Sequence, residues 1–170
     1  MSRFGQPATV GDLMAVDPIL IHANASLTEA AALLDKHHIH GLPVVDGAGA
    51  LVGVLSQTDL VRARSTEYLW ANWPGLAVRH LMTSPAITIT RSTPVPEAAA
   101  KMEKHHIHRL VVVADDDERL PIGVLSTTDL VHAIAWATGP SRDQMEQGAE
   151  REDAIPSGVA ADLEEAPDAR

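Results

Sequence analysis

The sequence predicts an α/β protein built from two copies of one β-α-β-β-α unit. The first observation is an internal repeat, because KHHIH occurs at Lys36–His40 and again at Lys104–His108. The repeat continues further along, where GVLSQTDLV at Gly53–Val61 returns as GVLSTTDLV at Gly123–Val131. The second observation is that short runs of Val, Leu and Ile alternate with segments of helical periodicity, which is typical of α/β folds.

Each unit is expected to begin with a short leading helix that comes before the first strand. This helix is VGDLM at Val10–Met14 in the first copy and VRHLM at Val78–Met82 in the second. In the first copy Pro18 follows, and the apolar run Ile19–Ile21 then predicts a short strand.

A longer helix follows the first strand in each copy. Ser26 has the residue type of an N-cap, and Glu29 stands three residues later, which together form the pattern of a capping box. The helix is predicted to run to about His38. In the second copy we expect Thr93 to be the cap and Pro94 the first helical residue, where a missing N–H is tolerated.

The second half of each unit predicts a β-hairpin and a final helix. In the first copy the strands are Leu42–Val45 and Leu51–Leu55, joined by the glycine-containing turn Asp46–Ala50. Ser56 should open the final helix, which is predicted to reach about Tyr68. The strands contain few polar residues, which indicates a sheet that is covered on both faces.

These elements define the predicted domain organisation. The first unit covers residues 9–69, a linker covers 70–76, and the second unit covers 77–138. The remaining residues, 139–170, carry three Arg against nine Asp and Glu and are rich in Ala, Pro and Gly. This composition predicts a disordered acidic tail.

Composition narrows the classes of function. The 170-residue chain is 45% hydrophobic but has only three Trp, one Tyr and one Phe, so its core must be aliphatic. It has no cysteine, no signal-peptide pattern and no apolar run long enough for a membrane span, so we expect a cytoplasmic protein without membrane contact. A net charge of −10 argues against general nucleic-acid binding.

The tandem pattern resembles the CBS domain over about Thr9–Ala137. The resemblance rests on LM followed by Pro before the first strand, on LPVVD, and on GVLS-x-TDL at the last turn. The second copy, with HRLVVV and GVLSTTDL, is similar to the nucleotide-binding units of the AMP-activated protein kinase regulatory subunit. The resemblance implies two units related by pseudo-two-fold symmetry, a homodimer, and a regulatory module that binds AMP, ADP, ATP or S-adenosylmethionine and acts through a protein effector.

The S-x-x-D sequences at Ser56–Asp59 and Ser126–Asp129 have two interpretations. Each is a capping box, and that role alone explains the spacing in most proteins. Each also lies at a helix N-terminus, where hydroxyl and backbone N–H groups can bind phosphate. An aspartate accepts hydrogen bonds only, which suits the two hydroxyls of a ribose. Both roles can hold in turn, with the cap yielding to the ligand.

The resemblance implies two related clefts between the units, each with apolar residues around a base and polar residues around ribose and phosphate. The first cleft combines Met14, Ile19 and Ile39 with His108, Arg109, Ser126, Thr128 and Asp129. The second combines Met82, Ile87 and Ile107 with His40, Ser56, Thr58 and Asp59.

The two clefts are not equivalent in sequence. Arg109 follows the last histidine of one KHHIH copy, whereas Gly41 follows that of the other. Since arginine binds phosphate with a planar fork of donors, we expect the Asp129 cleft to bind phosphate more tightly than the Asp59 cleft.

Three other interpretations of the sequence are a metal site, an enzyme and a ligand-free scaffold. His37 and His40 could share a helix face, but no Asp, Glu or Cys stands at the spacing that a zinc site needs, so we predict no metal. The repeated histidines are better explained as polar helix ends. No catalytic motif is present, so we predict no enzyme activity and no catalytic residue. The alternative to a ligand sensor is a dimerisation scaffold whose clefts bind nothing.

Overall fold

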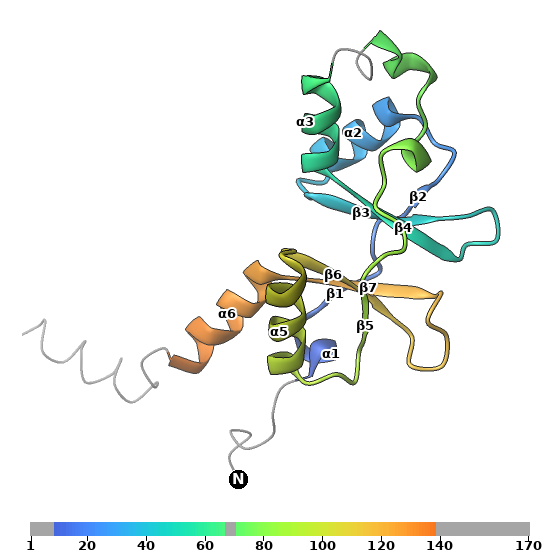
Figure 1. Ribbon diagram of the computed structural model, residues 1–170. Coiled ribbons are helices and arrows are strands. Elements are labelled where there is room, and N and C mark those ends of the chain that lie inside the picture. Colours follow the sequence, from blue (N-terminus) through green and yellow to red (C-terminus); the bar gives the residue numbers. More distant parts are fainter. Residues whose placement is uncertain (1–8, 67–70, 139–170) are drawn as a thin grey trace, which may run out of the picture. The chain divides into compact units, whose positions relative to one another are not determined.

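The computed structural model describes residues 9–66 and 71–138 (Figure 1). The described residues up to Ile134 belong to one compact unit. The predicted tail, 139–170, and residues 67–70 lie outside the described residues. In chain order the elements are α1 (Val10–Leu13), β1 (Ala15–Val16), β2 (Ile21–His22), α2 (Leu27–Lys36), β3 (Gly41–Val45), β4 (Leu51–Ser56), α3 (Gln57–Ser65), η1 (Trp73–Gly75), η2 (Val78–His80), β5 (Thr88–Thr90), α5 (Val95–His105), β6 (Arg109–Val113), β7 (Pro121–Ser126) and α6 (Thr127–Thr138).

The strands form two sheets that repeat one plan, which confirms the predicted α/β fold of two units. The first sheet has the order β2-β3-β4 and the second the order β1-β7-β6-β5. In each sheet the central strand pairs in parallel with the short first strand and antiparallel with its hairpin partner. The first strand is Ile21–His22 rather than Ile19–Ile21, because Ile19 packs against the core from the preceding loop.

The central strands carry the two cores. In β3 and in β6, four consecutive residues after the first are buried, Leu42–Val45 and Leu110–Val113. Consecutive residues of a strand point to opposite faces, so a strand in which all of them are buried must be covered on both faces of the sheet. The run of apolar residues predicted this. In the first unit, α2 and α3 lie on one side of β3 and β4 (Figure 1).

Helix starts follow the predicted caps in one long helix and depart from them in another. Ser26 caps α2, where its Oγ accepts a hydrogen bond from the Glu29 N–H at 3.1 Å. The prediction of Thr93 as the cap of α5 is wrong, since the N-cap residue is Pro94. The Thr93 hydroxyl instead lies 2.9 Å from that of Thr90, within the preceding turn, and is therefore engaged away from the helix end.

The final helices begin at the two S-x-x-D boxes. Asp59 Oδ2 accepts from Ser56 N–H at 2.8 Å and from its hydroxyl at 2.6 Å. Asp129 Oδ2 accepts from Ser126 N–H at 2.7 Å and from its hydroxyl at 2.6 Å. The structural role of the boxes as caps is thus present in both copies. The first of these helices ends at Ser65, before the predicted Tyr68.

The KHHIH copies mark the same helix end. Helix α2 stops at Lys36 and α5 at His105, so the first is two residues shorter than predicted. His38 and His106 both adopt the left-handed backbone conformation, with φ of 53° and 52°. Histidine is one of the few residue types enriched there, and this conformation turns the chain from the helix into the central strand.

The leading segments pack on the core of the opposite unit, which the sequence did not reveal. Val10 is fully buried in the second core, and Val78 is fully buried in the first. Backbone bonds fix both positions symmetrically, because Val10 N–H donates to Thr93 O and Val78 N–H to Ala25 O, each at 2.9 Å. Strand β1 then adds to the second sheet beside β7. The units are therefore joined by two reciprocal crossings.

Two glycines make these crossings possible. A Cβ atom on Gly123 would lie 2.7 Å from Met14 Sδ and 2.8 Å from the carbonyl oxygen of Ala15. A Cβ on Gly53 would lie 2.7 Å from the carbonyl oxygen of Thr83 and 2.9 Å from Met82 Sδ. Only a residue without a side chain lets the crossing backbone approach this closely.

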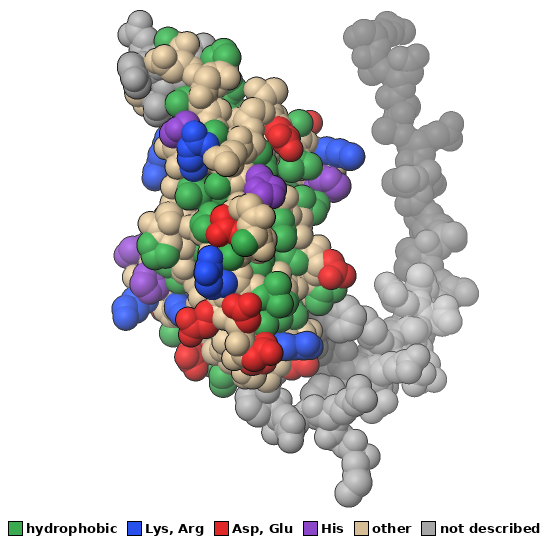
Figure 2. Space-filling model, turned by 90° about the vertical axis from the view of Figure 1, so that its right-hand side faces the viewer, with side chains coloured by type: hydrophobic (Ala, Val, Ile, Leu, Met, Phe, Trp, Pro, Cys, Tyr) green, Lys and Arg blue, Asp and Glu red, His purple; other side chains and the backbone are tan. Residues whose placement is uncertain are grey.

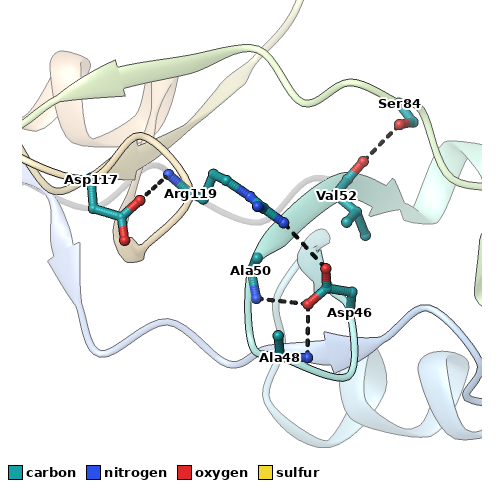
Figure 3. A network of polar contacts seen from close by, with 7 residues as sticks. All are labelled: Asp46, Ala48, Ala50, Val52, Ser84, Asp117 and Arg119. Atoms are coloured by element: carbon teal, nitrogen blue, oxygen red, sulfur yellow. Dashed lines mark hydrogen bonds and ion pairs between the residues drawn. The ribbon is translucent and has the colours of Figure 1, made fainter.

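A further contact joins the two hairpins on one side only (Figure 3). Arg119 Nη2 lies 3.3 Å from Asp46 Oδ2. The backbone carbonyl oxygen of Arg119 accepts a hydrogen bond from Leu51 N–H at 2.8 Å. The Asp46 carboxylate also accepts hydrogen bonds from the N–H groups of Ala50 and Ala48, which lower its pKa. The position that corresponds to Leu51 in the repeat is Pro121, which has no N–H to donate, so the contact has no counterpart.

The close packing of the crossing backbone on Gly53 and Gly123 predicts a specific loss of stability. Gly123→Ala and Gly53→Ala should each lower the free energy of unfolding by roughly 1–3 kcal/mol, because the added methyl group meets backbone that cannot easily move. Urea denaturation at neutral pH measures the change. Gly47→Ala is the matched control, since a Cβ there meets nothing within 4 Å. Equal stability of all three variants would show that the crossings are not closely packed.

The caps predict a smaller effect. Ser56→Ala and Ser126→Ala should each lower the free energy of unfolding by about 1 kcal/mol, because each removes the hydroxyl of an N-cap. Thr58→Ala and Thr128→Ala, at exposed positions in the same helical turns, should stay within about 0.5 kcal/mol of the parent. If serine and threonine variants unfold at the same urea concentration, the boxes do not stabilise the helices.

Candidate functional site

A pocket of about 400 Å³ lies between the two units, which is within the usual size of a small-molecule site. The first unit contributes the start of β3 and the β4–α3 turn, and the second contributes the loop before β5 and the second KHHIH copy. We call it the Asp59 pocket. It is lined by His40, Gly41, Val54, Ser56, Gln57, Thr58, Asp59, Arg62, Thr83, Ala86, Ile87, His106, Ile107, His108 and Arg109.

One end of the pocket is the start of helix α3. The backbone extends through Ser56 at the end of β4 and turns directly into the helix at Gln57, so the S-x-x-D box faces the cavity. Asp59 uses Oδ2 for the cap. Among the described residues its Oδ1 receives no hydrogen bond, and it therefore remains an acceptor for the hydroxyl groups of a ligand.

Apolar and cationic side chains complete the pocket. Ile87 and Ile107 are half-buried and also pack against the second core, which holds them in place. Arg62 and Arg109 bring two guanidinium groups, while Asp59 is the pocket's one carboxylate among the described residues. This combination can bind a partly apolar molecule that carries negative charge.

Most of the second predicted cleft is therefore brought together. Of its predicted residues, Ile87, Ile107, His40, Ser56, Thr58 and Asp59 all line the Asp59 pocket. Met82 does not line it, because its sulfur lies over Gly53 in the crossing between the units.

The first predicted cleft is divided by the structure. His108 and Arg109 line the Asp59 pocket, which differs from their predicted grouping with Asp129. The remaining residues of that cleft do not line this pocket: Met14 lies against Gly123, Ile19 and Ile39 pack on the first core, and Ser126, Thr128 and Asp129 stand at the start of α6.

Arg109 lines the Asp59 pocket, but the charged group that acts on it is Asp129. Burial lowers the pKa of its guanidinium, and the negative charge of Asp129 acts in the opposite direction. The Arg109 side chain lies close to Gly41, since a Cβ on Gly41 would lie 3.8 Å from Arg109 Cδ, which is an ordinary van der Waals distance. The side chain therefore passes over the glycine that occupies the equivalent position in the first unit.

Sequence reasoning missed several lining residues. Arg62 stands three residues after Asp59, hence on the same face of α3, and helical spacing alone could have identified it. Thr83 and Ala86 line the pocket because the crossing segment that starts at Val78 continues past it. They lie there only because each leading segment packs on the core of the opposite unit.

The described part of the chain shows no metal site and no membrane-spanning helix. Among residues 9–66 and 71–138, no three His, Asp or Glu side chains form a group that could hold a metal ion. In the same ranges no helix combines the length and apolar character needed to cross a bilayer. The face in Figure 2 mixes acidic, basic and apolar side chains, without a broad basic area on its described part.

A shallow groove of about 550 Å³ runs between α5 and α6. Its lining is mostly apolar, and it carries no carboxylate–hydroxyl box or arginine. It is lined by Ala99, Met102, Glu103, His106, Ile107, His108, Thr127, Leu130 and Val131.

Comparison with known proteins gives the family. The CBS domain model matches residues 10–66 and 78–135. The chain is 35% identical over 121 residues to L-aspartate semialdehyde sulfurtransferase of Methanocaldococcus jannaschii. This match covers 71% of this chain and 22% of that protein. It is 32% identical over 121 residues to inosine-5′-monophosphate dehydrogenase of Helicobacter pylori, covering 71% and 23%. The chain thus spans less than a quarter of the length of these two relatives.

Solved structures of similar size match along nearly their whole length. The CBS domain pair of protein MJ0100, in complex with 5′-methylthioadenosine and S-adenosyl-L-methionine, has a TM-score of 0.70 and 32% identity, covering 78% of this chain and all of that one. CBSX2 in complex with AMP has a TM-score of 0.66 and 30% identity, covering 76% and 98%. CBSX2 from Arabidopsis thaliana has a TM-score of 0.67 and 29% identity, and the match covers 80% of this chain and 100% of that one. The resemblance seen in the sequence is confirmed, and the chain belongs to the CBS domain family, with two CBS domains in tandem.

Proposed function

We propose that this CBS pair is a regulatory module that binds an adenosyl ligand, AMP, ADP, ATP or S-adenosylmethionine, in the Asp59 pocket. Binding there changes the relative orientation of the two units or their affinity for a protein effector. In this proposal the base lies against Ile87 and Ile107, and the ribose hydroxyls donate to Asp59. Ser56 and Thr58 supply hydroxyl groups, and His40 faces the phosphate.

The observation that carries the proposal is the composition of one pocket. It combines an aspartate with an unused oxygen, two isoleucines and a concentration of cationic side chains within about 400 Å³. These groups match, in order, the hydroxyls, the flat apolar base and the phosphate of an adenosine nucleotide. No catalytic role is assigned to any of these residues.

The related structures support the ligand class. One CBS pair with 32% identity is in complex with 5′-methylthioadenosine and S-adenosyl-L-methionine, and another with 30% identity is in complex with AMP. These ligands share an adenosyl group and differ in charge, so they support an adenosyl site here without selecting one compound.

Signalling follows from the position of the pocket. Its walls come from both units, so a ligand that contacts Asp59 on one side and Ile107 on the other binds best in one relative orientation. A ligand shifts a conformational equilibrium by its difference in affinity for the two states. The crossings keep the units together while this adjustment takes place.

A second candidate function is a ligand-free dimerisation scaffold. Val61 and Val131 occupy corresponding positions on α3 and α6 and are 68% and 60% exposed. Apolar residues exposed on the same face of both repeats favour association through these helices. Sedimentation at micromolar concentration tests this proposal: it predicts a dimer, and a monomer would contradict it.

A thermal-shift screen tests the ligand proposal. AMP, ADP, ATP, S-adenosylmethionine and 5′-methylthioadenosine are added to the full chain, with inosine monophosphate as a base control. A ligand at 100 times its dissociation constant should stabilise the fold by roughly 2.7 kcal/mol, which corresponds to a rise of several degrees in Tm.

Matched variants make the screen specific. Asp59→Ala should abolish the shift, whereas Glu118→Ala, which removes an exposed carboxylate outside the pocket, should retain it. Absence of a shift with every adenosyl compound would contradict the proposal and favour the scaffold.

A further inference from the structure

We infer that the groove between α5 and α6 binds the acidic segment that follows α6 in the same chain, and that this contact regulates the Asp59 pocket. The segment is residues 139–170, which lie outside the described residues, so the case for it rests on the groove and on the sequence. Binding of the segment to the groove is independent of the proposed function, whereas its effect on the pocket rests on that function.

The two repeats differ by one residue at the place where the groove lies. In the first unit Gln57, at the start of α3, reaches the end of α2, because its Nε2 donates to the carbonyl oxygen of Ile39 at 3.1 Å. The equivalent residue in the second unit is Thr127, which lines the groove. A threonine side chain is too short to make this bond, so the space between α5 and α6 is not bridged in the same way.

The groove presents apolar side chains to its opening. Val131 on α6 is 60% exposed, and Ala99 on α5 is exposed as well. Met102, which also lines the groove, is buried in the second core, so the groove reaches down to that core. Continuous apolar surface of this kind favours the docking of another segment of protein.

The first repeat shows where the chain goes after its last helix. Trp73, in η1, packs against the first core, and its Nε1 lies 3.4 Å from Thr28 Oγ1 in the first turn of α2. Leu76 packs on the same core. The chain therefore returns onto the helices of its own repeat. After the last helix of the second repeat, the chain that could return in this way is residues 139–170.

The sequence of the segment suits an apolar groove. Ile155, Val159 and Leu163 recur at a spacing of four, which places aliphatic side chains on one face when a segment binds as a helix. Pro156 fits the first turn of such a helix. The reach is also sufficient, because the residues between α6 and Ile155 can span about 50 Å when extended. The helix from Val131 to its end is only about 10 Å long.

Charge favours this segment over a second copy of the groove. Residues 139–170 carry three Arg against nine Asp and Glu. Lys104 and His105 are exposed at the end of α5, and His132 is exposed beside the groove on α6, while Glu103 is the carboxylate among the lining residues. An acidic segment is complementary to this rim. A second copy packed symmetrically on the groove would bring its own Lys104 and His105 there.

The groove and the Asp59 pocket share one wall. His106, Ile107 and His108 line both of them. A segment bound in the groove therefore contacts the same turn that a ligand in the pocket would contact from the other side. Two ligands that act on one element change each other's affinity by the same factor, which makes the segment a regulator of the pocket.

Paramagnetic NMR on the full chain tests the docking. The chain has no cysteine, so Ser157→Cys alone carries a nitroxide label, on the side of the segment away from its aliphatic residues. In the isotope-labelled chain, the nitroxide should remove most of the signal from the amides of Ala99 and Met102. The amide of Ala48, in the turn between β3 and β4, should keep its signal.

Two variants of the segment make the test specific without changing any described residue. Val159→Ser combined with Leu163→Ser should restore the Ala99 and Met102 signals, because it removes the aliphatic face. Ala161→Ser, on the opposite side, should leave the loss of signal as it is. Equal loss at Ala48, or a loss that persists in the Val159→Ser and Leu163→Ser variant, would overturn the inference.

A mixture of chains identifies the occupant of the groove. Isotope-labelled chain without nitroxide is mixed with unlabelled chain that carries it. The Ala99 and Met102 signals should stay intact, because the segment binds within its own chain. Loss of these signals in the mixture would show that a second copy occupies the groove, and would overturn the inference.

Calorimetry with AMP tests the link to the pocket. The variant with Val159→Ser and Leu163→Ser should bind AMP with an affinity that differs severalfold from that of the parent chain, whereas Ala161→Ser should match the parent. Equal affinities in all three chains would overturn the link while leaving the docking in place. Failure of the parent chain to bind any AMP would overturn the proposed function and the link with it, but not the docking seen by NMR.

Discussion

The structure depends on the reciprocal exchange of the two leading segments. Val10 completes the second core and Val78 the first, so neither core is complete within its own repeat. Both crossings pass over a glycine, Gly53 in β4 and Gly123 in β7, where the backbone carbonyl of the crossing segment lies too close for any side chain. The requirement is steric, and it explains why glycine occupies the third position of both strands β4 and β7.

The exchange also creates the site. The chain that crosses from the first unit to the second passes Thr83 and Ala86 along one wall of the pocket before it reaches Ile87. The same arrangement brings the β3 and β6 starts together, with Arg109 over Gly41. A pocket formed in this way belongs to both repeats. In the proposed function, a ligand that contacts both repeats would favour one relative orientation.

Much of the fold was predictable because it is encoded locally and twice. The repeat located the hairpins, the S-x-x-D caps and the helix ends, and each of these depends on neighbours within a few residues. The cap of α5 was misassigned because Thr90 competes for the Thr93 hydroxyl, which the sequence order does not show. The exchange was missed for a similar reason: a leading helix reads the same whether it packs on its own unit or on the other one.

The site too was predictable where a local motif encodes it and not where it depends on packing between the units. Ser56, Asp59 and Ile107 were found from motif positions, and the pocket contains them. The place of Arg109 in this pocket was not predicted, because the motif groups it with Asp129, whose charge does act on it. Single differences between repeats, at 41 and 109 or at 57 and 127, carry information that the repeated motif itself cannot.

A crystal structure of the full chain grown with AMP would test the central claim most directly. The account predicts AMP in the Asp59 pocket, with its base against Ile87 and Ile107 and its ribose hydroxyls within about 3 Å of the Asp59 carboxylate. AMP bound beside Asp129 with the Asp59 pocket empty would contradict it.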